Sequence, residues 1–65
     1  MEWTTFAIIH NIEWRVEDDP RLNAKIYRFR KGDKRLYYYI PLITLANTSR
    51  KLLEAELLRV IRGLV

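Results

Sequence analysis

The chain has 65 residues, of which 49% are hydrophobic and 31% charged, and it contains no cysteine and one histidine. This composition is typical of one small globular domain over residues 1–65, and it excludes disulfide bonds and argues against a structural zinc site. The 12 basic and 8 acidic residues give a net charge of +4, which fits nucleic-acid association and ordinary solubility equally well.

No stretch reaches the ~18 apolar residues that a membrane-spanning helix needs. The N-terminus also lacks the basic segment and apolar run of a signal peptide. We therefore expect a cytoplasmic protein. The abundance of Arg, Lys, Glu, Ile and Tyr without cysteine suits a thermophile.

Residues 1–17 alternate between apolar and other side chains, which indicates a β-strand. A straight strand of this length is too long for so small a domain. The segment is therefore either one strand bent near His10 and Asn11 or a hairpin at that point, and the lack of glycine favours the bent strand. The alternating positions are Thr4, Phe6, Ile8, His10, Ile12, Trp14 and Val16.

An acidic turn follows at residues 17–20, where Asp and Pro are ordinary turn formers. Residues 24–31 and 34–42 then form a hairpin around Gly32-Asp33, because glycine suits a two-residue loop that needs a positive φ. Pro41 marks a strand end, and residues 43–46 would prolong the second strand.

Residues 50–62 are predicted to form a helix. Ser49 follows two other capping residues, and Gly63 stands where a left-handed C-terminal cap is expected. Arg50 with Glu54, and Glu56 with Arg59, are spaced as neighbours on the helix surface. One stripe at helical spacing should face the core: Leu53, Leu57, Val60, Ile61 and Leu64.

The predicted fold is therefore α+β, with a β-β-β-α order. It has a three-stranded antiparallel sheet, or four strands if the first segment is a hairpin, and one C-terminal helix on one face. The two-residue loop sets Lys31 opposite Lys34 and Tyr27 opposite Tyr38. The face carrying these tyrosines is the more apolar, and we expect it to pack on the helix together with Phe6, Ile8, Ile12 and Trp14.

The opposite face should stay uncovered, because one helix covers only one side of a sheet. It would expose Ile26, Tyr37 and Tyr39, with Ala7 and Ile9 from the first strand. Exposed apolar patches usually mark contact surfaces, and Leu58 on the outer side of the helix adds to this one. The predicted partner-binding residues are therefore Ile26, Tyr37, Tyr39 and Leu58. The alternative is that exposed tyrosines are simply common in strands.

The hairpin is also basic, and its like charges face one another, so an anionic partner would relieve the repulsion. Arginines beside exposed tyrosines suit phosphate contacts and base stacking. The candidate nucleic-acid contacts are Arg28, Arg30, Lys31, Lys34 and Arg35. The alternative is that these long side chains extend into water.

We find no constellation for catalysis, a cofactor or a metal. His10 is isolated and falls among core-facing positions, where a structural, hydrogen-bonded role is expected. Ser49 has no partners that would make it a nucleophile. We therefore expect a binding protein and not an enzyme.

The segments KIYRFRKGDKRLYYYIPL and ITLANTSRKLLEAELLRVIRGL resemble the C-terminal two-thirds of the small dimer-forming subunits of the archaeal KEOPS complex, which modifies tRNA. The shared features are the hairpin, a polar junction and a terminal helix with a Leu-Arg-x-Ile segment, here Leu58 to Ile61. Those subunits carry a helix after the first strand, whereas this chain has a short acidic turn. The resemblance implies a non-catalytic, dimeric accessory subunit of an RNA-processing assembly, with direct nucleic-acid binding as the alternative, and it assigns no site residues.

Overall fold

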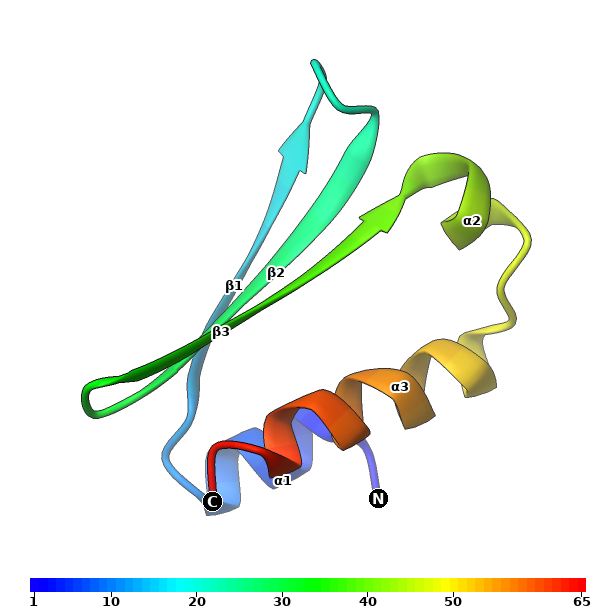
Figure 1. The fold of residues 1–65 in the computed structure, drawn as a ribbon. Helices are drawn as coiled ribbons and strands as arrows, with labels where there is room; N and C mark the ends of the chain where they lie inside the picture. The colour runs from blue at the N-terminus through cyan, green and yellow to red at the C-terminus, as the bar shows by residue number, and fades with distance from the viewer.

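A computed structural model describes residues 1–65 as an α+β fold (Figure 1). The three strands form one antiparallel sheet in the order β1-β2-β3, which confirms the predicted class and sheet. No helix is long and apolar enough to cross a bilayer. The elements in chain order are α1 (Trp3–Ile9), β1 (Glu13–Asp19), β2 (Ala24–Lys31), β3 (Lys34–Pro41), α2 (Leu42–Ala46) and α3 (Arg50–Arg62).

The β2–β3 hairpin has the predicted register. Lys31 pairs with Lys34, and Tyr27 pairs with Tyr38. Gly32 has a φ of 59° and is the one residue of the two-residue loop with a positive φ, the pattern of a type II′ turn. Because side chains alternate along a strand, this register decides which tyrosines lie on each face.

Helices α1 and α3 both pack on the same face of the sheet. In Figure 1 the helices α1 and α3 run side by side below the strands, while the other face carries no helix. The prediction that one face stays uncovered is therefore confirmed, although two helices cover the other face instead of one.

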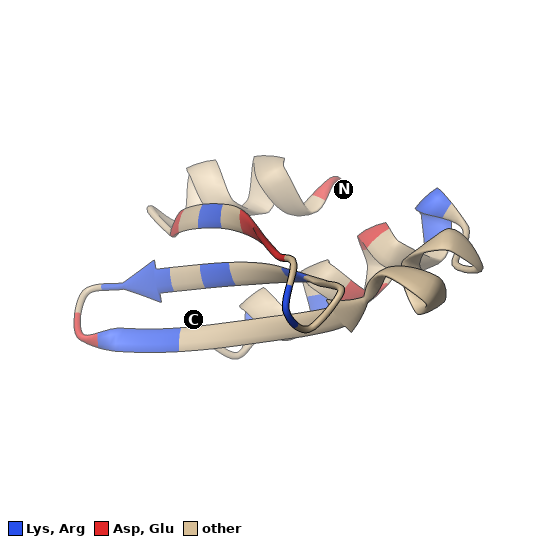
Figure 2. Cartoon of the chain, turned by 90° about the horizontal axis from the view of Figure 1, so that it is seen from above, with Lys and Arg blue, Asp and Glu red and all other residues tan.

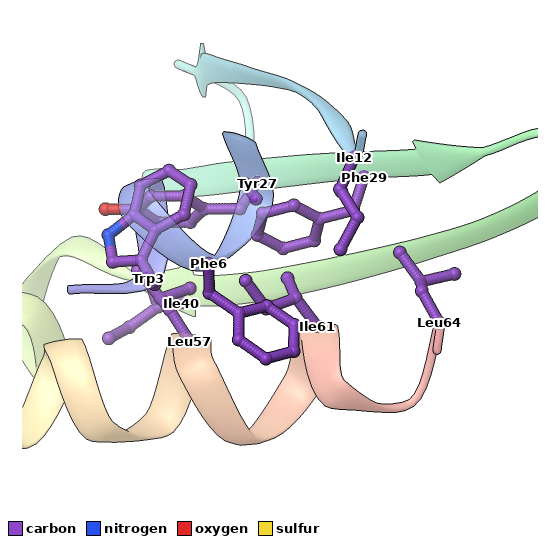
Figure 3. Close-up of a cluster of buried hydrophobic side chains, with 10 residues drawn as sticks. Trp3, Phe6, Ile12, Tyr27, Phe29, Ile40, Leu57, Ile61 and Leu64 are labelled. Atoms are coloured by element: carbon purple, nitrogen blue, oxygen red, sulfur yellow. The ribbon is translucent and has the colours of Figure 1, made fainter. Parts of the chain in front are cut away.

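The core between sheet and helices is built around Trp3. Its ring meets the rings of Trp14, Tyr27 and Phe29 edge to face, at centroid distances of 4.8, 6.1 and 5.8 Å, a favoured aromatic geometry. Figure 3 shows core side chains of the sheet, of α1 and of α3 packed against one another between the sheet and α3. The ten core residues are Trp3, Phe6, Ala7, Ile12, Tyr27, Phe29, Ile40, Leu57, Ile61 and Leu64.

The prediction of a strand over residues 1–17 is wrong up to Ile12, because Trp3–Ile9 forms α1. Trp3, Phe6, Ala7 and His10 recur at the i, i+3, i+4, i+7 spacing of a helix, which the apolar alternation hides. As a result Ile8, predicted in the core, is 76% exposed, and Ala7, predicted on the open face, is fully buried.

Helix α1 ends at Ile9 with His10 as its C-cap, and the following residue, Asn11, has a φ of 56°. The Asn11 N–H donates to the Ile8 carbonyl at 3.3 Å, and the Ile12 N–H donates to the Ala7 carbonyl at 2.8 Å. These two bonds form a Schellman motif with Asn in the left-handed position that glycine usually takes. The bend expected near His10 and Asn11 is therefore the end of a helix, and the strand begins only at Glu13.

The N-terminus of α1 is capped from a distant part of the chain. The Trp3 N–H donates to Glu54 Oε2 of α3 at 3.1 Å, and Glu2 provides no side-chain cap. Glu54 was expected to pair with Arg50 along α3, but it instead joins the two helices. A carboxylate at a helix N-terminus also interacts favourably with the backbone dipoles there.

Helix α3 follows the prediction at its start and differs at its end. Ser49 Oγ accepts from the Leu52 N–H at 3.1 Å, as an N-cap does. Gly63 has a right-handed conformation with a φ of −66°, so the predicted left-handed cap is wrong. The backbone keeps turning so that Leu64 reaches the core.

Residues 43–46 do not prolong β3, because Leu42–Ala46 forms the short helix α2 directly after Pro41. The Leu42 N–H donates to the Asn23 carbonyl at 2.8 Å. In the turn after β1, Asp19 Oδ1 accepts from the Arg21 and Leu22 N–H groups at 3.0 and 3.2 Å, as a turn-forming Asp does. The predicted turn at residues 17–20 is wrong in its bounds, because β1 continues through Asp19 and the turn covers residues 20–23.

Candidate protein-docking face

The uncovered face of the sheet is a grid of side chains set by the two strand registers. The three cross-strand rows nearest the hairpin loop make up the candidate site, and a fourth row of Asp19, Ala24 and Pro41 lies beyond them. From the hairpin loop outward the three rows are Glu13, Arg30 and Arg35; Arg15, Arg28 and Tyr37; and Glu17, Ile26 and Tyr39. We call these nine residues the open face.

The end of the open face near the hairpin loop is charged and largely self-paired. Arg30 Nη2 donates to both carboxylate oxygens of Glu13 at 2.9 and 2.8 Å. Glu17 Oε1 lies 2.7 Å from Arg15 Nε and 3.2 Å from Arg28 Nε. Figure 2 shows the alternating acidic and basic residues of β1 beside the basic ends of β2 and β3. Exposed pairs of this kind add about 0–1 kcal/mol each to stability, so their main effect is to order the side chains.

Arg28 is held between a carboxylate and a ring. Its guanidinium carbon lies 5.0 Å from the centroid of the Tyr37 ring, within the range of a cation–π contact. Its buried Nε has no hydrogen-bond partner, because the Glu17 oxygen is within ion-pair distance but not aligned with the N–H. Arg28 therefore keeps an N–H group without an aligned acceptor.

The other end of the open face is aromatic and apolar. Tyr37 is 58% and Tyr39 48% exposed, and Tyr39 lies directly across from the half-buried Ile26. The structure thus brings together three of the four predicted partner-binding residues. Ala7 and Ile9, expected beside them, lie instead on α1 on the opposite side of the sheet.

Leu58, the fourth predicted partner-binding residue, was expected to be exposed and is not. It is half-buried and packs against the core. The exposed leucine of α3 is Leu52, at 65%. The apolar stripe of α3 is broader than expected because α1 lies beside α3 and covers a second flank of it.

The five predicted nucleic-acid contacts divide between two places. Arg28, Arg30 and Arg35 share the open face. Lys31 and Lys34 flank the hairpin loop on the opposite side of the strands, and Lys31 Nζ donates to the His10 carbonyl at the end of α1. The expected facing of Arg30 and Arg35 is present, but Glu13 compensates Arg30, so the repulsion that favoured an anionic ligand is reduced.

An open depression of about 450 Å³ lies over the charged end of this face. Six residues of the open face line it (Glu13, Arg15, Arg28, Arg30, Arg35 and Tyr37), together with Trp14 and Phe29. Arg35 takes part in none of the ion pairs, which all involve other arginines and Lys25. The depression therefore brings together the unpaired Arg35, the ring of Tyr37 and arginines that are paired with carboxylates.

Two features of the surface were missed from the sequence. The first is the open-face side of β1, formed by Glu13, Arg15 and Glu17, whose alternating charges were visible in the sequence. The second is the apolar outer side of α1, where Ile8 and Ile9 are exposed. His10 has its ring 4.2 Å from that of Phe6, and its backbone carbonyl, not its ring, has the observed hydrogen bond.

Comparison of this chain with protein-family models, with curated protein sequences and with solved structures gives no match. Nothing in these comparisons bears on the resemblance to the small KEOPS subunits. The functional argument therefore rests on the geometry of the open face.

Proposed function

We propose that the chain is a small non-catalytic accessory subunit that docks a partner protein on the open face of its sheet. The observation that carries the proposal is the exposure of Tyr37 and Tyr39 beside Ile26, on a face that no helix covers. Contiguous exposed apolar residues rimmed by polar ones are typical of contact surfaces. Tyrosine and arginine are also enriched among residues that dominate binding energy.

The charges of the open face specify the chemistry of the partner. It carries four arginines and two glutamates, so it is positive overall. Arg35 has no carboxylate partner, and the Arg28 Nε lacks an aligned acceptor. The surface that fits is an apolar or aromatic residue flanked by carboxylates, which would contact the tyrosines and complete the hydrogen bonds of the two arginines.

Direct nucleic-acid binding is the rival function. A phosphate backbone needs cations that are free to contact it, whereas Arg28 and Arg30 already lie against Glu17 and Glu13. Bringing phosphates to these arginines would also bring them next to the two carboxylates. This observation favours a protein partner. The resemblance to subunits of a tRNA-modifying complex suggests an RNA-processing assembly as its setting.

The test is affinity capture from lysate of the source organism, with and without nuclease treatment, using three forms of the full chain. The double variant Tyr37→Ala/Tyr39→Ala removes the aromatic part of the open face. The matched control Ile8→Ala/Ile9→Ala removes two exposed apolar side chains from α1, on the far side of the molecule. Circular dichroism of all three forms checks that the fold is kept.

We expect the wild type and the α1 control to recover the same protein, and the tyrosine variant to recover at least ~10-fold less, as loss of interface aromatics predicts. The binding of a single-stranded RNA oligonucleotide is measured in parallel by fluorescence anisotropy at two salt concentrations. Capture that disappears on nuclease treatment, or RNA affinity that falls steeply with salt, would instead establish the nucleic-acid function.

A further inference from the structure

The outer edge of β3 is a free sheet edge. The strand order β1-β2-β3 leaves β3 with one neighbour only, and in Figure 2 it forms the border of the sheet on the side away from β1. A free edge presents unpaired backbone N–H and C=O groups that template the addition of another strand.

The hairpin register identifies which groups these are. In a two-residue hairpin the residues flanking the loop form a hydrogen-bonded pair, and such pairs alternate along the ladder. Because Lys31 and Lys34 flank the loop, every second residue from Lys34 bonds to β2. The backbone groups of Arg35, Tyr37 and Tyr39 therefore point outward, and none of them takes part in the turn, loop and cap hydrogen bonds. Pro41 has no N–H to offer.

The two edges of the sheet differ in how they are protected. Five of the seven residues of β1 are charged, and charges discourage edge pairing. In β3 the charges stop at Arg35, and residues 36–40 read LYYYI before Pro41. A five-residue run of β-forming side chains without charge, glycine or proline is typical of segments that pair with another strand.

We propose that β3 pairs antiparallel with β3 of a second copy of this chain, about a two-fold axis at Tyr37. In this register all three outward residues form hydrogen-bonded pairs: Arg35 lies opposite Tyr39 of the second copy, and the two Tyr37 residues lie opposite each other. About six backbone hydrogen bonds join the strands. The dimer contains one continuous six-stranded sheet.

The side chains of β3 are complementary to themselves in this register. On the open face, arginine faces tyrosine at both ends and tyrosine faces tyrosine at the centre, so cation–π and aromatic pairs form. On the covered face Leu36 lies opposite Tyr38 of the second copy. The two Arg35 side chains are four residues apart along the strands, about 13 Å, which exceeds the screening length of about 10 Å at 0.1 M salt.

Neighbouring registers are worse. Moving the axis to Leu36 sets Tyr39 opposite Asp33 of the second copy, in the hairpin loop. Moving it to Tyr38 sets Arg35 opposite Pro41 of the second copy, which has no N–H. Either shift leaves two complete hydrogen-bonded pairs in place of three. The inference goes beyond the proposed docking function and does not depend on it, since the dimer uses an edge and leaves the open faces exposed side by side.

The experiment compares the self-association of two variants at Tyr37, on the β3 edge, with that of a matched variant at Val16, on the β1 edge. Tyr37→Pro removes an N–H that points away from β2, so the hairpin ladder keeps its bonds. Tyr37→Thr removes the ring but keeps the N–H. Val16→Pro makes the equivalent change at the outer edge of β1, where the register places Val16 among the outward residues. Sedimentation equilibrium measures self-association, and hydrogen exchange by NMR measures the protection of individual amides.

The wild type should be a dimer in which the amides of Arg35, Tyr37 and Tyr39 are protected. Tyr37→Pro should weaken dimerisation at least ~10-fold, whereas Tyr37→Thr weakens it less, and Val16→Pro leaves it unchanged. A wild type that is monomeric at millimolar concentration would overturn the proposal. So would a dimer in which the Arg35 and Tyr39 amides exchange freely, or one that the Pro and Thr variants weaken equally, because such a dimer joins through its open faces.

Discussion

The two faces of the sheet come from the same three strands, and tyrosine occurs on both. Tyr27 and Tyr38 lie on the covered face, where Tyr27 contacts the Trp3 ring, while Tyr37 and Tyr39 lie in the solvent on the open face. Strand propensity cannot distinguish these positions, because it is the same for all four. The position of the helices decides which tyrosines stabilise the fold and which remain available to a partner.

The largest expected difference between the faces is in stability. Phe29→Ala removes a side chain that is 98% buried in the aromatic cluster, and such changes cost about 3–5 kcal/mol. Tyr37→Ala, on the open face, should cost about 1 kcal/mol or less. Urea unfolding followed by fluorescence measures both. Because small domains have thin stability margins, we expect Phe29→Ala to be largely unfolded, and equal losses in the two variants would contradict the comparison.

A smaller effect is expected where a polar contact fixes α1 on the covered face. Glu54→Ala removes the acceptor of the Trp3 N–H, and loss of a helix cap costs about 0.5–2 kcal/mol. The matched control is Glu56→Ala, two residues along α3, where Glu56 pairs only with the neighbouring Arg59. Chemical denaturation should show a clear loss for Glu54→Ala and little change for the control. Equally small changes in both variants would mean that α1 is held by its apolar side chains alone.

Elements that are fixed by nearby residues in the chain were predicted correctly, whereas the element that depends on a distant residue was not. The hairpin and α3 depend on local signals, namely Gly32 in a two-residue loop and Ser49 before a helical stripe, and both were predicted to within one residue. Helix α1 has seven residues, too few to be stable alone. Its cap comes from Glu54, 51 positions away, and its threonines and isoleucines favour strands, so the local pattern predicted the wrong element.

The same reasoning applies to the candidate site. Ile26, Tyr37 and Tyr39 were predicted to share a face because the hairpin register is local. The β1 residues Glu13, Arg15 and Glu17 were not placed beside them, because the register of β1 with β2 depends on where α1 ends. The Schellman motif at Asn11 sets that point. Prediction failed for Leu58 for a related reason: α1 covers a flank of α3 that appears free when α1 is read as a strand.

The smallest expected effect concerns the pH dependence of the covered face. Burial raises the pKa of Tyr27 above its usual value of 10.0, and the charges of Asp18 and Glu54 add to the shift. The folded protein thus keeps Tyr27 neutral at a pH where the unfolded chain ionises it. This contribution to stability is complete below pH 10 and is lost as the pH rises through the raised pKa of the folded state. We therefore expect Tyr27→Phe to lose less stability than the wild type between pH 9 and pH 11 (roughly the range that brackets an ordinary tyrosine pKa) in urea unfolding experiments. Lysines and other tyrosines titrate in both proteins, so the difference between the two curves isolates Tyr27, and parallel curves would show that the Tyr27 hydroxyl is solvated in the folded state.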